Sequence, residues 1–132
     1  LIGKLKDDTG ASVMLITHDL GVIAETADRV AVMYAGQIVE TGDVDAIFDR
    51  PMHPYTSGLL HSIPRLNEDK DRLHSIEGVV PSPFDMPMGC RFAPRCPLAD
   101  ARCSGAGEAP TLGSIEPGHE VRCIKAGMEV TA

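Results

Sequence analysis

The chain has 132 residues, enough for one ordinary domain or two small ones. Its apolar content of 43% is typical of a globular protein, and its formal net charge of −7 excludes the basic surface that nucleic-acid binding needs. No apolar run approaches the roughly 20 residues that span a bilayer, and no secretory signal is visible. We therefore expect a cytosolic protein whose thiols stay reduced.

The chain begins with alternating helical and strand-like patterns. Apolar side chains at helical spacing predict a helix over residues 1–6, and Gly10 suits the left-handed turn that ends such a helix. Residues 12–17 are an apolar run typical of a strand buried on both faces of a parallel α/β sheet. Ligands of such sheets bind beyond the carboxyl ends of the strands, where His18 would lie, and Asp19 is placed to cap the next helix. Because the sequence opens in what reads as the back half of a helix, we interpret it as a piece of a longer protein.

A hairpin and two short helices are predicted next. Residues 30–34 and 37–40 read as strands that turn at Gly36, and the alternation in the second strand indicates an edge or half-exposed position. Helices are expected over residues 44–50 and 54–63, since each follows a residue or a proline that suits a helix start and ends at a proline. These elements predict the α/β fold class.

The composition changes near residue 66. Residues 65–75 are mostly charged, and we place a boundary there between a first part, 1–66, and a small irregular extension, 67–132. The extension holds seven of the ten prolines and all four cysteines, with few aliphatic residues. Such a segment buries too little apolar surface to offset its ordering entropy, so we expect it to need a cross-link, a metal or a host surface.

The four cysteines, Cys90, Cys96, Cys103 and Cys123, allow three interpretations. They are unrelated reduced thiols, or a disulfide framework, which a cytosolic location disfavours, or the ligands of one metal centre. Zinc usually prefers C-x-x-C knuckles, and the spacings here are wider, although spacing alone does not exclude zinc. Four cysteines are also the ligand count of a [4Fe–4S] cluster. An arginine near each cysteine would either offset the charge of a cluster or be solvated: Arg91, Arg95, Arg102 and Arg122.

Three motifs carry a resemblance to a known family. Residues 15–20, Leu-Ile-Thr-His-Asp-Leu, together with the hairpin region up to Gly42, resemble the C-terminal part of the nucleotide-binding domain of ABC transporter ATP-binding subunits, which contains a switch histidine, the H-loop. Residues 53–56, His-Pro-Tyr-Thr, resemble the oligopeptide/dipeptide subfamily. Residues 89–97, Gly-Cys-Arg-Phe-Ala-Pro-Arg-Cys-Pro, resemble the C-terminal extension of the same subfamily.

The resemblance implies an ATP-binding subunit of a peptide importer, an ATPase that couples hydrolysis to transport in its full-length form. His18 would be the catalytic residue, in contact with the γ-phosphate of ATP, and ATP and Mg²⁺ would be the cofactors. The implied partners are a second ATP-binding subunit and transmembrane permease subunits, at the cytoplasmic face of the membrane. In some members the extension carries an iron–sulfur cluster, which would make the four cysteines its ligands, with zinc as the alternative.

Several motifs of an ABC ATPase are missing from the sequence. It contains no G-x-x-x-x-G-K-[ST] loop, no Walker B acidic strand and no LSGGQ-like segment. We therefore expect the chain alone neither to bind ATP tightly nor to hydrolyse it. The alternative function is that of a metal-binding interaction module, formed by the extension, that docks transporter subunits. A stand-alone metalloprotein would require residues 1–66 to fold without the rest of their predicted sheet.

Overall fold

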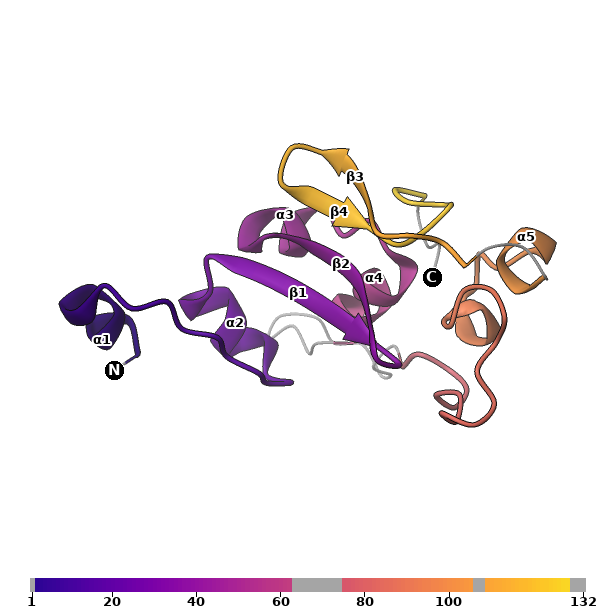
Figure 1. Ribbon diagram of the computed structural model, residues 1–132, viewed down its shortest axis with the longest axis horizontal. Coiled ribbons are helices and arrows are strands. Elements are labelled where there is room, and N and C mark those ends of the chain that lie inside the picture. Colours follow the sequence, from indigo (N-terminus) through magenta and orange to yellow (C-terminus); the bar gives the residue numbers. More distant parts are fainter. Residues whose placement is uncertain (1, 63–74, 106–108, 129–132) are drawn as a thin grey trace, which may run out of the picture.

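The computed structural model describes residues 2–62, 75–105 and 109–128. Figure 1 shows an elongated molecule, with α1 (Ile2–Thr9) at one end, a β-sheet in the middle and α5 (Ala101–Ser104) near the other end. None of the helices described is long and apolar enough to cross a membrane. The predicted boundary between residues 66 and 67 lies outside the described residues, so the division of the chain at that point stays a prediction.

The first helix runs three residues beyond its predicted end at residue 6, to Thr9, and the second helix begins at its predicted cap. Gly10 follows α1 with a φ of +64°, and its N–H donates to the carbonyl of Lys6 at 2.9 Å. Asp19 caps α2 (Leu20–Thr26), because its Oδ1 accepts the N–H groups of Gly21 at 3.0 Å and Val22 at 3.2 Å. Both residues thus give partners to backbone groups that a helix end leaves open.

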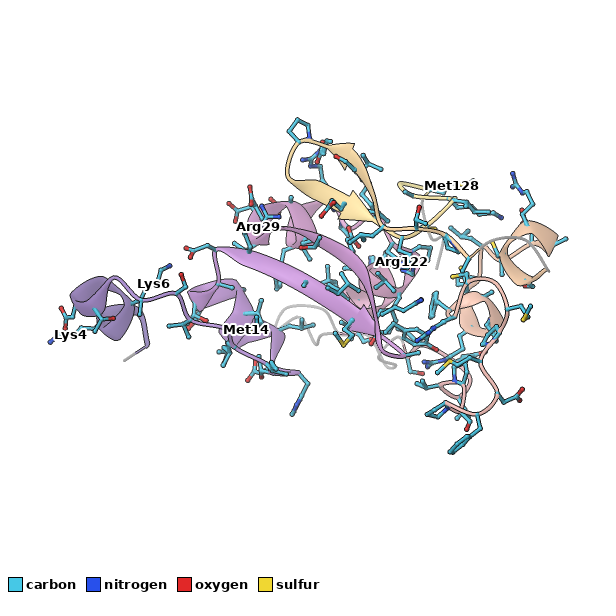
Figure 2. All side chains as sticks on the ribbon, in the orientation of Figure 1. Lys4, Lys6, Met14, Arg29, Arg122 and Met128 are labelled. Carbon is cyan, nitrogen blue, oxygen red and sulfur yellow. The ribbon has the colours of Figure 1, made fainter. Side chains whose placement is uncertain are left out.

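The prediction of a buried strand over residues 12–17 is wrong. These residues form an extended, exposed segment between α1 and α2, and no described strand pairs with them. Met14 is 89% exposed and Ile16 is 91% exposed; Figure 2 labels Met14 on this segment. A strand is stable only where neighbouring strands take up its backbone hydrogen bonds and other elements cover its faces. Among the residues described, the strands that could do so pair with one another instead.

The predicted hairpin is confirmed in β1 (Arg29–Tyr34) and β2 (Gln37–Asp43). Ala35 and Gly36 connect the strands with φ values of +46° and +77°, which is the two-residue turn whose twist matches that of a β-hairpin. The side chains of Val32, Tyr34 and Val39 are buried between this hairpin and the helices.

A second hairpin, from the C-terminal part of the chain, completes the sheet. β3 (Gly113–Glu116) and β4 (His119–Val121) give the strand order β1-β2-β4-β3, with every neighbouring pair antiparallel. β4 pairs with the free side of β2, placing Val121 opposite Glu40. The expectation that the second strand lies at an edge is therefore wrong, because a strand about eighty residues further on covers it. The α/β class is confirmed, but this sheet is antiparallel rather than parallel.

The core of the molecule combines side chains from both halves of the chain. α3 (Val44–Asp49) contributes Ile47, and α4 (Pro54–His61) lies beside the same cluster, close to where these helices were predicted. Phe92, just before the short 3₁₀ helix η1 (Ala93–Arg95), inserts among aromatic rings, with its centroid 5.2 Å from that of Tyr34 and 5.5 Å from that of Tyr55. The extension thus finds in the hairpin and α4 the host surface that its composition requires.

Arginines beside the cysteines attach the extension to the rest of the molecule. Arg91 donates to the carbonyl of Ala35 in the first hairpin turn at 2.5 Å. Arg122, labelled in Figure 2, donates to the carbonyl of Ile38 at 2.8 Å. Arg95 donates to two carbonyls of the chain leading into the extension, at 2.7 and 2.8 Å. These three guanidinium groups bind backbone oxygens and are not simply solvated surface groups.

Candidate functional site

His18, the predicted catalytic residue, is exposed at the junction between the extended segment and α2. The backbone N–H of Asp19 donates to Oγ1 of Thr17 at 3.0 Å, which fixes a tight turn around the histidine. The imidazole is therefore held at the end of the apolar segment and is open to a ligand. An imidazole ring can donate a hydrogen bond to a phosphate oxygen, which is the chemistry the resemblance implies for it.

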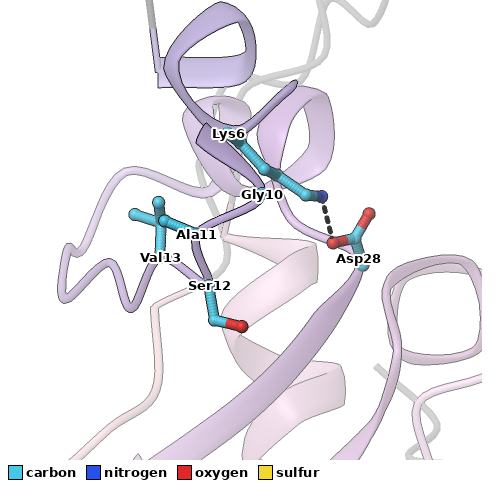
Figure 3. Close-up of a pocket in the computed structure, with 6 residues that line it drawn as sticks. All are labelled: Lys6, Gly10, Ala11, Ser12, Val13 and Asp28. Carbon is cyan, nitrogen blue, oxygen red and sulfur yellow. Dashed lines mark hydrogen bonds and ion pairs between the residues drawn. The ribbon is translucent and has the colours of Figure 1, made fainter. Parts of the chain in front are cut away.

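A pocket lies at the other end of the same segment. It has a volume of about 360 Å³, and Figure 3 shows its lining. Lys6 of α1 and Asp28, just before β1, form an ion pair across it. Neither His18 nor any of the four cysteines lines this pocket. The remaining lining residues are small or apolar: Gly10, Ala11, Ser12 and Val13.

The four cysteines, which the sequence spreads over 34 positions, gather in the fold. The N–H of Cys90 donates to the carbonyl of Cys103 at 2.9 Å, which joins the segment before η1 to α5. Gly89 makes this approach possible, because a Cβ at that position would lie 2.3 Å from the same carbonyl oxygen. Cys123 follows β4 and lies within electrostatic range of the other three thiols.

The surroundings of the thiols oppose their ionisation. Burial raises the pKa of Cys90 and Cys96, and it raises the pKa of Cys123 to about 11. The negative charge that neighbouring cysteines would carry adds to these increases. Without a bound cation, Cys90, Cys96 and Cys123 therefore stay protonated and are poor nucleophiles at neutral pH.

Backbone N–H groups nevertheless point at three of the sulfurs. The sulfurs of Cys90, Cys96 and Cys123 each accept the backbone N–H of the residue two positions later. For Cys123 this donor is Lys125, at 3.3 Å from Sγ. Such bonds stabilise a thiolate and lower its pKa, in opposition to burial. The donor set therefore fits a metal–thiolate group in composition and hydrogen bonding.

The cysteine side chains are not arranged as the ligands of a metal ion. All four cysteines are reduced and unpaired, so the disulfide alternative does not form. Within the described residues, no group of three or more His, Cys, Asp or Glu side chains is arranged to hold a metal ion. A zinc–thiolate site needs every sulfur about 2.3 Å from one ion, so these thiols would have to rotate toward a common centre.

Asp100 ties the cysteine region together from its edge. Its carboxylate lies 2.8 Å from Nη2 of Arg102 and 2.8 Å from Nζ of Lys125. Hydrogen bonds from Arg102 and Lys125 hold the pKa of this carboxyl well below its ordinary value. Arg102 thus pairs with Asp100, and Lys125 links the segment after Cys123 to α5.

A cluster of buried polar side chains, which was not predicted from the sequence, lies where the two hairpins and α4 meet. Glu40 of β2 is fully buried and accepts the N–H groups of Met52 at 2.7 Å and His53 at 3.0 Å. His119 of β4, 1% exposed, places Nε2 2.8 Å from Oε1 of Glu40. The sequence did contain a signal for it. Pro117-Gly118 lies between two segments that alternate apolar and polar residues, a pattern typical of a β-hairpin turn, and such a hairpin would place His119 in the sheet.

His53 is a buried histidine at the start of α4. Its Nδ1 accepts the N–H of Tyr55 at 3.0 Å, which caps the helix, and burial lowers the pKa of the ring to about 4. The ring is therefore neutral at neutral pH, with its proton on Nε2. Among the residues that the structure describes, that atom has no hydrogen-bond partner, and leaving a buried N–H group unpaired lowers stability.

Comparison with known proteins identifies a family for the middle of the chain. Residues 39–103, which include most of the strand β2, the helices α3 and α4 and three of the cysteines, match the family described as oligopeptide/dipeptide transporter, C-terminal region. This segment of the chain belongs to that family.

Individual relatives extend the similarity over nearly the whole chain. The oligopeptide transport ATP-binding protein AppD of Bacillus subtilis (strain 168) is 54% identical over 124 residues, which are 94% of this chain. The dipeptide transport ATP-binding protein DppD of Escherichia coli (strain K12) is 47% identical over 123 residues, or 93% of this chain. The chain spans only 37% of the length of each of these relatives.

Proposed function

We propose that this chain is the C-terminal part of an ATP-binding subunit of a peptide importer, which couples ATP hydrolysis to peptide transport. The observation that carries this proposal is the identity of about half of all residues, over 93% of the chain, to ATP-binding proteins named for dipeptide and oligopeptide transport. The substrate class is therefore short peptides.

His18 is the residue we assign to catalysis. Its exposed ring at the end of the extended segment is available to a nucleotide held by parts of the protein that this sequence lacks. A donor at the γ-phosphate stabilises charge that develops during phosphoryl transfer, and it detects whether the terminal phosphate is present. The chain lacks the phosphate-binding loop and the acidic strand that would hold ATP and Mg²⁺, so we expect no hydrolysis by the chain alone.

The same proposal defines the partners and the location. Two ATP-binding subunits would close around ATP and reopen after hydrolysis, and this movement would drive transmembrane permease subunits. The protein would then lie at the cytoplasmic face of the membrane without a membrane-spanning segment in this part of its chain. The exposed apolar residues 12–17 fit this proposal, because strands elsewhere in the longer protein would cover them.

Peptide uptake tests the proposal. Cells that lack the intact gene should lose import of radiolabelled di- or oligopeptides and regain it when the gene is restored. Restoration by a copy carrying His18→Ala should fail at a similar protein level, whereas a copy carrying His61→Ala, a change in another exposed histidine, should succeed. Unchanged peptide uptake in the absence of the gene would contradict the proposed substrate class.

A metal centre at Cys90, Cys96, Cys103 and Cys123 is a second candidate. Its support is the gathering of four thiols with N–H donors on three of the sulfurs. An iron–sulfur cluster, or zinc in its place, would supply a cation that stabilises the thiolates and cross-links three segments of the extension. In this alternative the extension is an interaction module that docks transporter subunits.

Metal analysis of the full-length protein, purified without oxygen, tests the second candidate. About four irons and four sulfides per chain are expected for a [4Fe–4S] cluster, and one zinc for the runner-up. The metal content should fall when Cys103 is changed to serine and should stay when Ser104 is changed to alanine. A metal-free protein with four titratable thiols would contradict the candidate.

A further inference from the structure

The buried ring of His119 lies between two carboxylates that belong to different elements. On one side Nε2 is 2.8 Å from Oε1 of Glu40 on β2. On the other side Nδ1 is 3.3 Å from Oε1 of Glu116, at the end of β3. Gly42 leaves room for the ring, because a Cβ there would lie only 3.3 Å from its Cδ2 atom.

We infer that His119 is a doubly protonated imidazolium that fastens the β3–β4 hairpin to β2 by donating to Glu40 and Glu116 at once, so that the hairpin is released as the pH rises. A neutral imidazole has one N–H group and one lone pair. Either neutral tautomer would therefore turn a lone pair toward a carboxylate oxygen. The imidazolium has a donor for each acceptor.

The charges around the ring fit this assignment. Arg50, after α3, binds Glu116 through two contacts of 3.0 and 3.4 Å, so the order along the network is Arg50⁺, Glu116⁻, His119⁺, Glu40⁻. Hydrogen bonds from His119 and then Arg50 hold the pKa of Glu116 below its ordinary value. His53, from α4, faces Glu40 as a neutral ring because burial lowers its pKa to about 4.

The burial of Glu40, at one end of this network, explains why the docking of the hairpin depends on one proton of His119. Glu40 is fully buried, and its other two hydrogen bonds come from backbone N–H groups, which carry no net charge. His119 is the cation that the described residues bring into hydrogen-bonding contact with it. Removing one partner of a buried ion pair leaves an uncompensated charge, which is strongly unfavourable.

Several contacts attach this short hairpin to β2, and one of them follows β4 directly, where the N–H of Arg122 donates to the carbonyl of Val39 at 2.8 Å. β4 pairs with β2 at only two positions, Glu40 with Val121 and Thr41 with Glu120. Arg29 adds a hydrogen bond to the carbonyl of Gly118 at 3.2 Å in the hairpin turn. Cys123 lies two residues beyond β4, so undocking of the hairpin would also move this cysteine away from the other three.

Hydrogen–deuterium exchange of the full-length protein between about pH 6 and about pH 9 tests the inference across the range in which a histidine titrates. The protection of the β4 amides is measured relative to that of the β1–β2 hairpin, which cancels the intrinsic effect of pH on exchange. Because undocking releases one proton, we expect the relative protection to fall with rising pH, by at most about tenfold per pH unit. Protection that does not depend on pH would overturn the inference.

Three variants distinguish a protonated His119 ring from a neutral one. His119→Gln can still donate to Glu40 and does not titrate, so its β4 protection should be independent of pH. Glu116→Gln should shift the loss of protection to lower pH, whereas a neutral ring would accept a hydrogen bond from the new amide and gain protection. Glu120→Gln, in the next residue, should behave like the original protein.

The nitrogen chemical shifts of the histidine rings, measured by NMR at about pH 6.5, decide the matter even where a variant does not fold. Two protonated nitrogens are expected for His119. A neutral ring, with its proton on either nitrogen, would overturn the inference.

Discussion

Phe92 is the residue through which the cysteine-containing extension joins the core. It is 2% exposed and contacts the rings of Tyr34, Tyr55 and His53 at centroid distances of 5.2 to 5.8 Å. Such a ring contributes both its buried area and its edge-to-face contacts. Its position after Cys90 is visible in the sequence, but its three aromatic neighbours come from segments more than thirty residues earlier, so the contact could not be predicted locally.

Phe92→Ala should therefore destabilise the protein by about 3–5 kcal/mol, because it leaves a cavity among the rings. Denaturant unfolding of the full-length protein measures this change. Phe84→Ala is the matched control, since that ring is 100% exposed, and its effect should stay within about 0.5 kcal/mol. Equal effects of the two substitutions would contradict the core described here.

Gly89 is the second residue whose role depends on a close approach. A Cβ there would meet the carbonyl oxygen of Cys103 at 2.3 Å, so Gly89→Ala must push the Cys90 segment away from α5. We expect faster reaction of Cys103, which is buried, with a thiol reagent in this variant. Gly113→Ala, where a Cβ meets nothing within 4 Å, should leave thiol reactivity unchanged.

At the scale of elements, two apolar runs that look alike in the sequence adopt different structures. Residues 30–34 become β1 because Gly36 returns the chain onto them two residues later. Residues 12–17 carry a similar pattern, but no described strand pairs with them, and they are extended and exposed. Hydrophobic pattern predicted both runs as strands, and only the local turn identified the one that forms here.

The β3–β4 hairpin depends on its turn. Gly118 has a φ of +79°, where an L side chain costs about 1–2 kcal/mol. Gly118→Ala should therefore reduce the protection of the β4 amides from hydrogen exchange by roughly tenfold, while the β1–β2 hairpin stays protected. Loss of protection in both hairpins together would mean that the two do not open separately.

At the scale of the whole molecule, the sequence analysis could predict local elements and caps but not the sheet that joins them. The caps at Asp19 and Gly10 depend on neighbours within four residues, so their signals are local. The pairing of Glu40 with His119 spans 79 residues, and no spacing rule connects such distant positions. The proximity of the cysteines likewise arises from tertiary contacts, and the common metal site that their number suggested stays a prediction.

Global stability should also depend on pH in the acidic range through His53. Its pKa is lowered to about 4 in the folded protein, against 6.5 for an ordinary histidine, so the unfolded chain binds the proton more readily between those values. The neutral buried ring makes its full contribution to the free energy of unfolding above about pH 6.5. This contribution is lost as the pH falls toward 4, by about 3 kcal/mol in total. Denaturant unfolding at a series of pH values measures this loss.

His53→Asn removes the titrating ring and keeps a side chain suited to a helix start. Its stability should change less between neutral and acidic pH than that of the original protein. A steeper loss of stability in the variant would contradict the assignment of a neutral buried ring.

The most direct test of the proposed function is ATP hydrolysis by the full-length protein with and without the ring of His18. His18→Ala should reduce turnover by on the order of 100-fold while ATP binding is kept, because a donor to the transferred phosphate is lost. His61→Ala, which removes another exposed histidine, should leave turnover unchanged. Full turnover by the His18→Ala protein would contradict the assignment of this residue to catalysis, and absence of ATP binding by the unaltered protein would contradict the function itself.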